Sequence, residues 1–286
     1  MSDQAAQLRA IMAATRANTR SHDPVTPAGP PAIVVGSGKG GVGKSVVSVL
    51  LAAQLVEQGR RVLLVDGDQN LGSLHVLLGV RPVARLEEML NDSIAPRDML
   101  QPVGERLWLL PADSGAESLY AMGSVDRARL HHRLSTVYDG FDAVIIDAGP
   151  GIESVVRVST MRATRLVVVT VPEPAALTDA YALIKIVNLQ VPELPIDILA
   201  NRAMDEAEGR ACYERLATAA DRFLRREVRY LGTLVEDESV RMAVREPGRL
   251  LTGVKSGPVA EEMAAIAADR FELPALAGSA RLTGGH

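Results

Sequence analysis

A glycine-rich segment, residues 36–45 (GSGKGGVGKS), constrains the fold of this chain more than any other part of the sequence. An apolar run, 32–36, precedes it, and a helical pattern over 44–58 follows it. Residues 38–45 fit G-x-x-x-x-G-K-S, a spacing in which loop amides and the next helix N-terminus surround phosphate groups. Gly36, Gly38 and Gly41 also fit the less restrictive dinucleotide pattern G-x-G-x-x-G, with Asp66 ending the next strand. The more restrictive match favours a P-loop.

The chain from residue 32 onwards alternates short apolar runs with helical patterns. Expected strands cover 32–36, 61–66, 106–111, 142–147, 165–171, 195–201 and 228–235, and expected helices cover 44–58, 124–138, 152–162, 174–188, 205–226 and 256–270. Near-continuous apolar strands are typical of sheets buried on both faces, and strand–helix alternation produces right-handed βαβ crossovers. We predict an α/β fold: a single P-loop NTPase domain with a mostly parallel twisted sheet and helices on both faces.

The two ends of the sequence differ from this pattern. Residues 2–17 place Leu8, Ile11 and Met12 at helical spacing, and residues 21–31 contain four prolines. We expect a tethered helix in 1–20, a proline-rich linker in 21–31, the P-loop domain in 32–273 and a flexible tail in 274–286. From spacing alone, the first segment is either a frayed extension or a helix that docks into the groove of a partner.

Composition indicates the compartment. The single cysteine, Cys212, cannot form an internal disulfide or hold an iron–sulfur cluster alone. No apolar run approaches the ~20 residues of a membrane span, and the first 30 residues lack the apolar core of a signal peptide. We therefore expect a cytoplasmic protein. Trp108, within a strand-like run, is expected in the core.

Charged residues lie where a P-loop fold would bring them together. Lys44 is expected to reach the β- and γ-phosphates and the Ser45 hydroxyl to coordinate Mg²⁺. Asp147 ends one expected strand, where it can hold the Mg²⁺ hydration shell, and Asp66 and Asp68 follow another. Either aspartate of that pair could instead cap the segment that follows. The preferred interpretation is that Asp68 positions the attacking water while Asp66 supports the metal shell.

A second lysine, Lys39, is not required by the ordinary motif. With it, residues 39–45 (KGGVGKS) resemble the deviant Walker A motif of the MinD/ParA class of P-loop ATPases. The resemblance implies a homodimer formed with ATP, in which Lys39 reaches the nucleotide of the partner subunit, and slow hydrolysis that releases it. It also implies Walker B and switch II roles for Asp147 and Gly149. No Asn-Lys-x-Asp guanine signature is visible, so ATP is favoured over GTP.

The resemblance gives a set of site residues. The expected cofactors are ATP or ADP with Mg²⁺, and Asn201 and Arg202 resemble the adenine-contacting pair of the class. Nucleotide contacts are expected from Gly38, Lys39, Gly40, Gly41, Val42, Gly43, Lys44, Ser45, Val46, Gly149, Asn201 and Arg202. Metal contacts are expected from Ser45, Asp66 and Asp147, and catalytic roles from Lys39, Lys44 and Asp68.

Several members of the class do not fit. Nitrogenase iron protein and iron–sulfur scaffold ATPases need paired cysteines, arsenite-pump ATPases carry two P-loops, and tyrosine kinases of this class carry a C-terminal tyrosine cluster, which this chain lacks after Tyr230. Residues 172–185, 230–232 and 237–245 resemble the flagellar-number regulators FlhG or FleN, also called YlxH. Residues 3–9 (DQAAQLR) match the N-terminal helix of that group. The resemblance covers roughly residues 3–270.

The resemblance also implies partners. In that group the N-terminal helix stimulates the GTPase of FlhF, so Gln4, Leu8 and Arg9 are candidate contacts to such a GTPase. A flagellar transcription activator or a switch-complex protein is a further expected partner. The expected location is the cytoplasm, and the alternative is peripheral association at the inner membrane face or the cell pole.

Two features depart from the group or suggest another function. Residues 259–272 carry four acidic residues and one basic residue, a local charge of −3, which is the wrong sign for an anionic membrane. Membrane binding is therefore doubtful.

The alternative function is a ParA-like DNA-associated positioning ATPase. Its basis is one basic stripe that would form if helix continued far enough to include Arg222, Arg225, Arg226 and Arg229. A solvated helix face is the preferred interpretation of that stripe, and DNA is an unlikely partner.

Overall fold

The structure is a computed structural model, and it describes residues 29–68, 74–82, 84, 88, 90–111, 124–156, 163–271 and 273. In chain order the elements are β1 (Ala32–Gly36), α2 (Lys44–Glu57), β2 (Val62–Gly67), α3 (Leu74–Leu78), η2 (Pro96–Met99), β3 (Gln101–Pro102), β4 (Leu107–Leu110), α5 (Ser124–Tyr138), β5 (Ala143–Ala148), β6 (Arg165–Thr170), α7 (Pro174–Gln190), β7 (Ile196–Ala203), α8 (Glu206–Leu224), β8 (Arg229–Val235), α9 (Glu238–Val244), α10 (Arg249–Thr252), α11 (Pro258–Ala265) and η3 (Ile266–Arg270).

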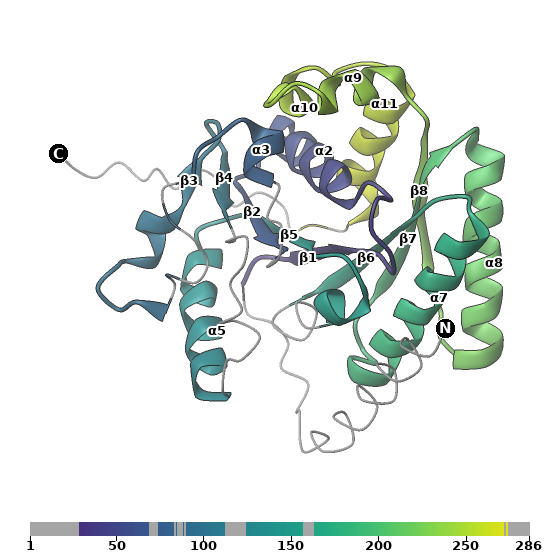
Figure 1. Cartoon of the computed structure of the whole chain (residues 1–286), viewed down its shortest axis with the longest axis horizontal. Helices are drawn as coiled ribbons and strands as arrows, with labels where there is room; N and C mark the ends of the chain where they lie inside the picture. Colours follow the sequence, from purple (N-terminus) through teal and green to yellow (C-terminus); the bar gives the residue numbers. More distant parts are fainter. Residues whose placement is uncertain are drawn as a thin grey trace.

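These strands form one eight-stranded sheet in the order β3-β4-β2-β5-β1-β6-β7-β8 (Figure 1). Every pairing is parallel except that of the two-residue edge strand β3 with β4. Because the strands run parallel, their carboxyl ends meet at one edge of the sheet. The P-loop, Asp66, Asp147 and Asn201 all come to this edge, which we call the nucleotide edge.

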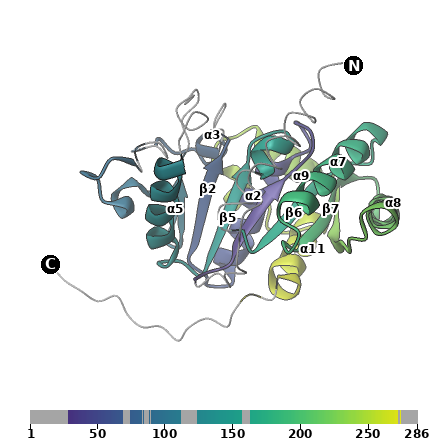
Figure 2. The ribbon, with the colours of Figure 1, turned by 90° about the horizontal axis from the view of Figure 1, so that it is seen from below.

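Helices cover both faces of the sheet (Figure 2). Along β1, Ala32 and Val34 pack into a core beneath α5, α7 and α8, whereas Ile33 and Val35 pack into a second core beneath α2, α3 and α11. This alternation explains why the strands read as continuous apolar runs, since each face of the pleat is buried. The predicted α/β fold with a mostly parallel sheet between two helical layers is confirmed.

The short elements differ from the expectation. All seven expected strands form, with ends shifted by at most two residues, but β3, α3, η2, α9 and α10 had no counterpart in the predicted pattern. Each spans two to seven residues, too few for a hydrophobic period to stand out. Within the predicted helix 152–162, residues 152–156 are helical, and residues 157–162 lie outside the described part of the chain.

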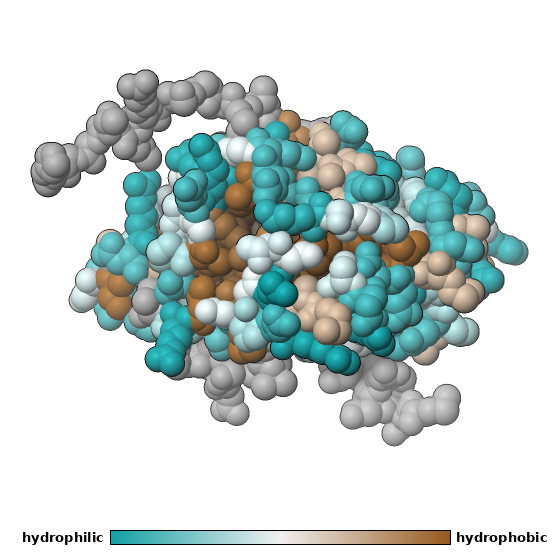
Figure 3. All heavy atoms as spheres, turned by 90° about the horizontal axis from the view of Figure 1, so that it is seen from above, coloured by the Kyte–Doolittle hydropathy of each residue, from teal (hydrophilic) through white to brown (hydrophobic). Residues whose placement is uncertain are grey.

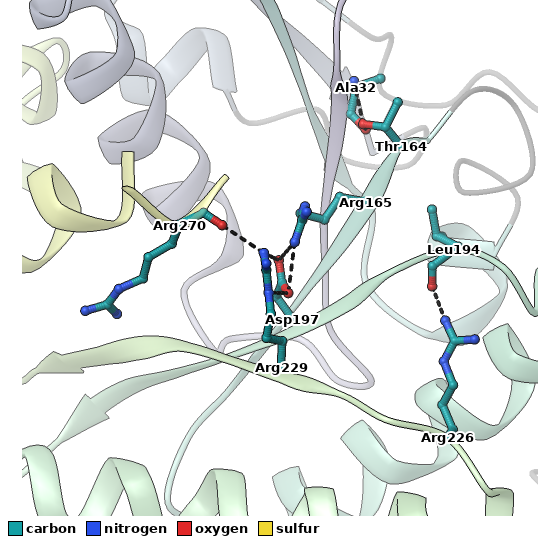
Figure 4. A network of polar contacts seen from close by, with 8 residues as sticks. All are labelled: Ala32, Thr164, Arg165, Leu194, Asp197, Arg226, Arg229 and Arg270. Carbon is teal, nitrogen blue, oxygen red and sulfur yellow. Dashed lines mark hydrogen bonds and ion pairs between the residues drawn. The ribbon is translucent and has the colours of Figure 1, made fainter. Parts of the chain in front are cut away.

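The predicted continuation of α8 through Arg226 is wrong, and the basic stripe does not form. The helix ends at Leu224, and Arg225 takes a left-handed conformation with φ 51°. Beyond it the Arg226 guanidinium donates to the carbonyls of Pro192 and Leu194, and Arg229 lies in β8 (Figure 4). The four arginines therefore do not share one helix face, and the feature that suggested DNA binding is absent from this part of the described chain.

A buried carboxylate holds the sheet together at the edge opposite the nucleotide edge. Asp197 is fully buried, and its oxygens lie 2.9 Å from Arg165 Nη1 and 3.0 Å from Arg229 Nε (Figure 4). Arg229 Nη2 also donates to the Arg270 carbonyl oxygen at 2.8 Å. These contacts join the first residues of β6 and β8 to the second residue of β7 and to the C-terminal helical segment.

The C-terminal helical segment, α11 with η3, belongs to the core. Val259, Met263 and Ile266 are buried against β8 and α2, so the apolar face of the helix is already covered. Gly232 in β8 permits the close approach, because a Cβ there would lie 2.2 Å from Glu262 Oε1. Figure 3 views the molecule from the side of α9 and α10, where hydrophilic side chains flank a strip of apolar atoms. Among the described helices, none is long and apolar enough to cross a bilayer.

Candidate nucleotide-binding site

The P-loop is shaped by glycines that contact neighbouring elements. Gly41 and Gly43 have positive φ angles of 79° and 93°, which glycine adopts without strain. A Cβ on Gly38 would lie 2.1 Å from the Asp179 carbonyl oxygen in α7, and one on Gly43 would lie 2.4 Å from Asn201 Nδ2. The loop is therefore pressed between α7 and the end of β7, and side chains at these positions would push it out of place.

The loop leads into α2, whose N-terminus suits an anion. Gly43 caps the helix, and no described side chain accepts a hydrogen bond from the first-turn amides there. The first turn contains no acidic residue. Free amide donors and the helix dipole make such a terminus a phosphate site, so the local structure agrees with the sequence motif.

Lys44 is the buried cation of the site. Its side chain begins α2, and the residue is only 8% exposed. Burial lowers the pKa of its ammonium group, while the negative charges of Asp147 and Asp68 act in the opposite direction. A buried lysine in the field of two carboxylates keeps a positive charge at the position where the motif expects phosphate oxygens.

Asp147 ends β5 beneath the P-loop helix. Its carboxylate is 2% exposed, accepts a hydrogen bond from Ser48 Oγ at 3.0 Å and also bonds the Ser45 hydroxyl. Burial raises its pKa to about 6, and the two hydroxyls and Lys44 limit the rise. The expected pair of Ser45 and Asp147 therefore meets in the structure.

Asp66 lies beside Asp147 on the neighbouring strand. The two are directly paired in the β2–β5 register, and Asp66 is 1% exposed. Burial, followed by the Asp147 charge, raises the Asp66 pKa to about 7, although its oxygens accept the amides of Asp68 at 3.1 Å and Leu74 at 3.2 Å. Two neighbouring buried carboxylates, one of which disfavours the ionisation of the other, form a place where a divalent cation is electrostatically favoured.

The donor set fits Mg²⁺. A hydroxyl and two carboxylates supply oxygen ligands, and Mg²⁺ usually takes one or two protein carboxylates with phosphate and water completing the shell. Among the described residues no group of three or more histidine, cysteine, aspartate or glutamate side chains could hold a metal by itself. A magnesium ion here would therefore depend on the phosphates of the nucleotide.

Asp68 and Gly149 lie together at the nucleotide edge. A Cβ on Gly149 would lie 3.2 Å from Asp68 Oδ1 and 2.8 Å from Ser154 Oγ, so the Gly149 backbone is packed against the aspartate. Asp68 also acts electrostatically on Lys44, Asp66 and Asp147. The structure brings the expected water-positioning carboxylate and the expected switch II glycine to one place.

Lys39 and Lys44 occupy different surroundings. Lys39 lies at the rim of the loop, its side chain 34% exposed, and its Nζ is 2.8 Å from Glu173 Oε2. Glu173 precedes α7 at the cap position, and the hydrogen bond from Lys39 lowers its pKa. Glu173 lies within residues 172–185, and the sequence predicted no role for it, because a contact between residues 134 positions apart leaves no local signal.

The remaining expected contacts surround the loop. Asn201 Nδ2 donates to the Val42 carbonyl at 2.8 Å, so this side chain supports the loop, while Arg202 is exposed with φ 53°. Gly40 faces Pro150 of the loop after β5, and Val46 packs against the core beneath α2. Gln4, Leu8 and Arg9 lie outside the described residues. Contact of any of these residues with nucleotide stays a prediction.

Comparison with known proteins assigns the family. The family model for ParA, described as NUBPL iron-transfer P-loop NTPase, matches residues 31–268. The antiactivator FleN of Pseudomonas aeruginosa is 38% identical over 216 residues, which cover 75% of this chain and 76% of that protein. This chain belongs to the ParA/MinD family of P-loop NTPases.

Further relatives agree with this ParA/MinD assignment. The flagellum site-determining protein YlxH of Helicobacter pylori is 34% identical over 215 residues, 75% of this chain and 72% of that protein. Among solved structures, the septum site-determining protein MinD of Pyrococcus horikoshii, complexed with Mg-ADP, superposes with a TM-score of 0.68 over 85% of this chain and 97% of that one. Its 23% sequence identity supports the fold alone. Iron transfer belongs to the description of the family model, and this ParA-family chain has one cysteine, Cys212, which is buried.

Proposed function

We propose that this protein is an ATP-dependent dimerising switch that regulates the number or placement of flagella. The observation that carries the proposal is the placement of the two P-loop lysines. Lys44 is buried beside Asp147, whereas Lys39 stands at the rim with its ammonium group on an exposed glutamate. Only the outer lysine can leave its own subunit and reach the phosphates of a second one.

Each residue has a role in this proposal. Lys44 and the α2 amides bind the phosphates, and Ser45, Asp147 and Asp66 are the residues that would hold Mg²⁺, which neutralises phosphate charge when bound. Asp68 orients the attacking water and accepts its proton at a carboxylate oxygen. Lys39 releases Glu173 and stabilises charge on the partner's nucleotide, so that hydrolysis and dimer release are linked. The switch then turns over slowly.

Light scattering with ATP and Mg²⁺ tests the switch. Asp68→Ala should accumulate a dimer because the nucleotide is bound but not hydrolysed, whereas Asp68→Ala combined with Lys39→Ala should remain monomeric. Lys255→Ala is the matched control, since Lys255 is an exposed lysine whose Nζ lies 4.0 Å from Glu57. An Asp68→Ala protein that stays monomeric at saturating ATP would contradict the proposal.

The flagellar part rests on similarity to FleN and YlxH at 38% and 34% identity. We infer that residues 1–20 dock on an FlhF-type GTPase through Gln4, Leu8 and Arg9 and stimulate its turnover. The name of the Pseudomonas relative, antiactivator FleN, supports a flagellar transcription activator as a second partner. A switch-complex protein would be the other candidate.

Deleting residues 1–20 tests the first partner. The truncated protein should keep its basal ATPase activity and lose stimulation of the GTPase, measured as phosphate release from GTP.

Pelleting with nonspecific DNA and with anionic liposomes, each with and without ATP, tests whether the protein binds DNA or a membrane surface. We expect weak binding to both, because the basic stripe is broken and the apolar face of α11 is buried. Strong ATP-dependent DNA binding would instead favour the partition-type function.

A further inference from the structure

A groove with a volume of about 340 Å³ lies at the edge of the sheet opposite the nucleotide. Leu100 and Pro102 form one wall, Val137 and Gly140 belong to the end of α5 and its loop, and Trp108 and Phe141 complete the apolar surface. The groove thus lies between the edge strands β3 and β4 and the helix that covers them. Its volume falls at the lower end of the range for binding pockets.

The aromatic lining is unusual for this chain. The sequence contains one tryptophan and three phenylalanines, and two of these four residues meet here. The rings of Trp108 and Phe141 pack edge to face, with centroids 5.4 Å apart, and both residues are only partly buried. Trp108 was expected in the core, but it is only partly buried: it packs against the core and also lines the groove. A partly exposed tryptophan in a groove is the kind of side chain that anchors partners.

Two arginines stand at the rim of the groove. The guanidinium of Arg97 is exposed and has no hydrogen bond or ion pair with any residue that the structure describes. Arg61 Nε lies 3.7 Å from Asp142 Oδ2, and its side chain is 40% exposed. Among the residues that line the groove, Arg61 and Arg97 are the charged ones and both are basic, so the lining itself carries positive charge beside an apolar floor. This combination suits an apolar group attached to negative charges.

We propose that this groove binds an acidic segment of a partner protein, which inserts a bulky apolar side chain against Trp108 and Phe141. A peptide suits the site because the groove opens to solvent past exposed Pro102 and Arg97. A side chain can fill it while the peptide backbone and its carboxylates stay outside, within reach of the two guanidinium groups.

The groove is independent of the nucleotide. Arg61 precedes β2 and Phe141 precedes β5, so both lie where the strands begin, whereas Asp66 and Asp147 lie where the same strands end. A partner in the groove can therefore bind while nucleotide occupies the P-loop. The proposal does not rest on dimer formation or on ATP hydrolysis, and its failure would leave both untouched.

The chain offers a direct probe, because Trp108 is its only tryptophan. Trp108 fluorescence of the full-length protein is titrated with acetyl-Glu-Glu-Phe-Glu-Glu-amide, with its all-lysine counterpart, and with the acidic peptide in which alanine replaces phenylalanine. We expect a saturable change with the first peptide alone. Arg97→Glu should weaken that binding about tenfold or more, whereas Arg215→Glu, an equal charge change on exposed α8, should not.

A second measurement separates binding from folding. Trp108→Phe keeps an aromatic ring, so binding of the fluorescently labelled acidic peptide, followed by anisotropy, should stay within about threefold of wild type. Equal binding of the acidic and basic peptides, or equal loss in Arg97→Glu and Arg215→Glu, would overturn the proposal. A change in Trp108 emission with protein concentration alone would also overturn it, because a second copy of the chain would then occupy the groove.

Discussion

The paired carboxylates beneath the P-loop predict that the protein without metal or nucleotide loses stability as pH rises. Burial raises the Asp66 pKa from 3.8 to about 7, so the folded state holds a proton there between about pH 4 and pH 7 that the unfolded state releases. Because the folded state binds more protons in this window, the free energy of unfolding falls as pH increases. From pH 5 to pH 8 the contribution of Asp66 to stability falls by roughly 3 kcal/mol, because the folded state binds about one more proton over the two units between pH 5 and pH 7, at 1.36 kcal/mol per pH unit.

Urea unfolding followed by circular dichroism, in the presence of a chelator, measures this effect. Asp66→Asn cannot ionise, so the free energy of unfolding of that variant should fall by about 3 kcal/mol less than wild type across the same pH range. Asp98→Asn, on an exposed residue of η2, is the matched control and should follow wild type. Adding Mg²⁺ with ADP should flatten the wild-type dependence, because a cation favours the ionised carboxylate. Parallel curves for wild type and Asp66→Asn would refute the reasoning.

Three further perturbations follow from the contacts of the site and of the opposite edge. Lys44→Ala should abolish productive nucleotide binding in calorimetric titration, because it removes the only buried cation of the described site, and unchanged ATP affinity and turnover would contradict that role. Glu173→Gln removes the charge that holds Lys39 within its own subunit, so a lower ATP concentration should be needed to form dimers in light scattering. A higher ATP concentration for dimer formation would contradict the idea that Glu173 holds Lys39 back. Asp197→Ala should lower the free energy of unfolding by about 3–5 kcal/mol in urea titration, since two guanidinium groups lose their buried counter-charge, and a loss below 1 kcal/mol would contradict this role.

The parts of the fold that the sequence predicted are those with a long periodic signal. The seven buried strands and α2, α5, α7 and α8 each extend over enough residues for apolar runs or helical spacing to be visible. The P-loop was predictable because its chemistry lies within eight consecutive residues. The meeting of Asp66 and Asp147 was also predictable, because the ends of parallel strands share an edge.

What could not be predicted depends on distant contacts. The Lys39–Glu173 pair joins residues 134 positions apart, and the groove around Trp108 is built from four separate stretches of chain. The predicted end of α8 at residue 226 was wrong because arginines at helical spacing fit a helix that continues past Leu224. In the structure Arg226 donates to carbonyls before β7 and Arg229 pairs with Asp197, and these partners determine where the helix stops.

The glycines of the nucleotide edge explain why the motif alone does not make the site. Gly38 is in contact with the backbone of α7, Gly43 with Asn201 at the end of β7, and Gly149 with Asp68 after β2. Each contact brings a different element against the loop or its carboxylates. A Cβ would not fit at Gly38 or Gly43, and one at Gly149 would crowd Asp68 and Ser154. The phosphate cradle therefore takes its shape only when β2, β5, β6 and β7 are all in register. Displacement of any one strand end by a partner would change the geometry at the phosphates, and this dependence is the physical basis on which a fold of this kind can act as a switch.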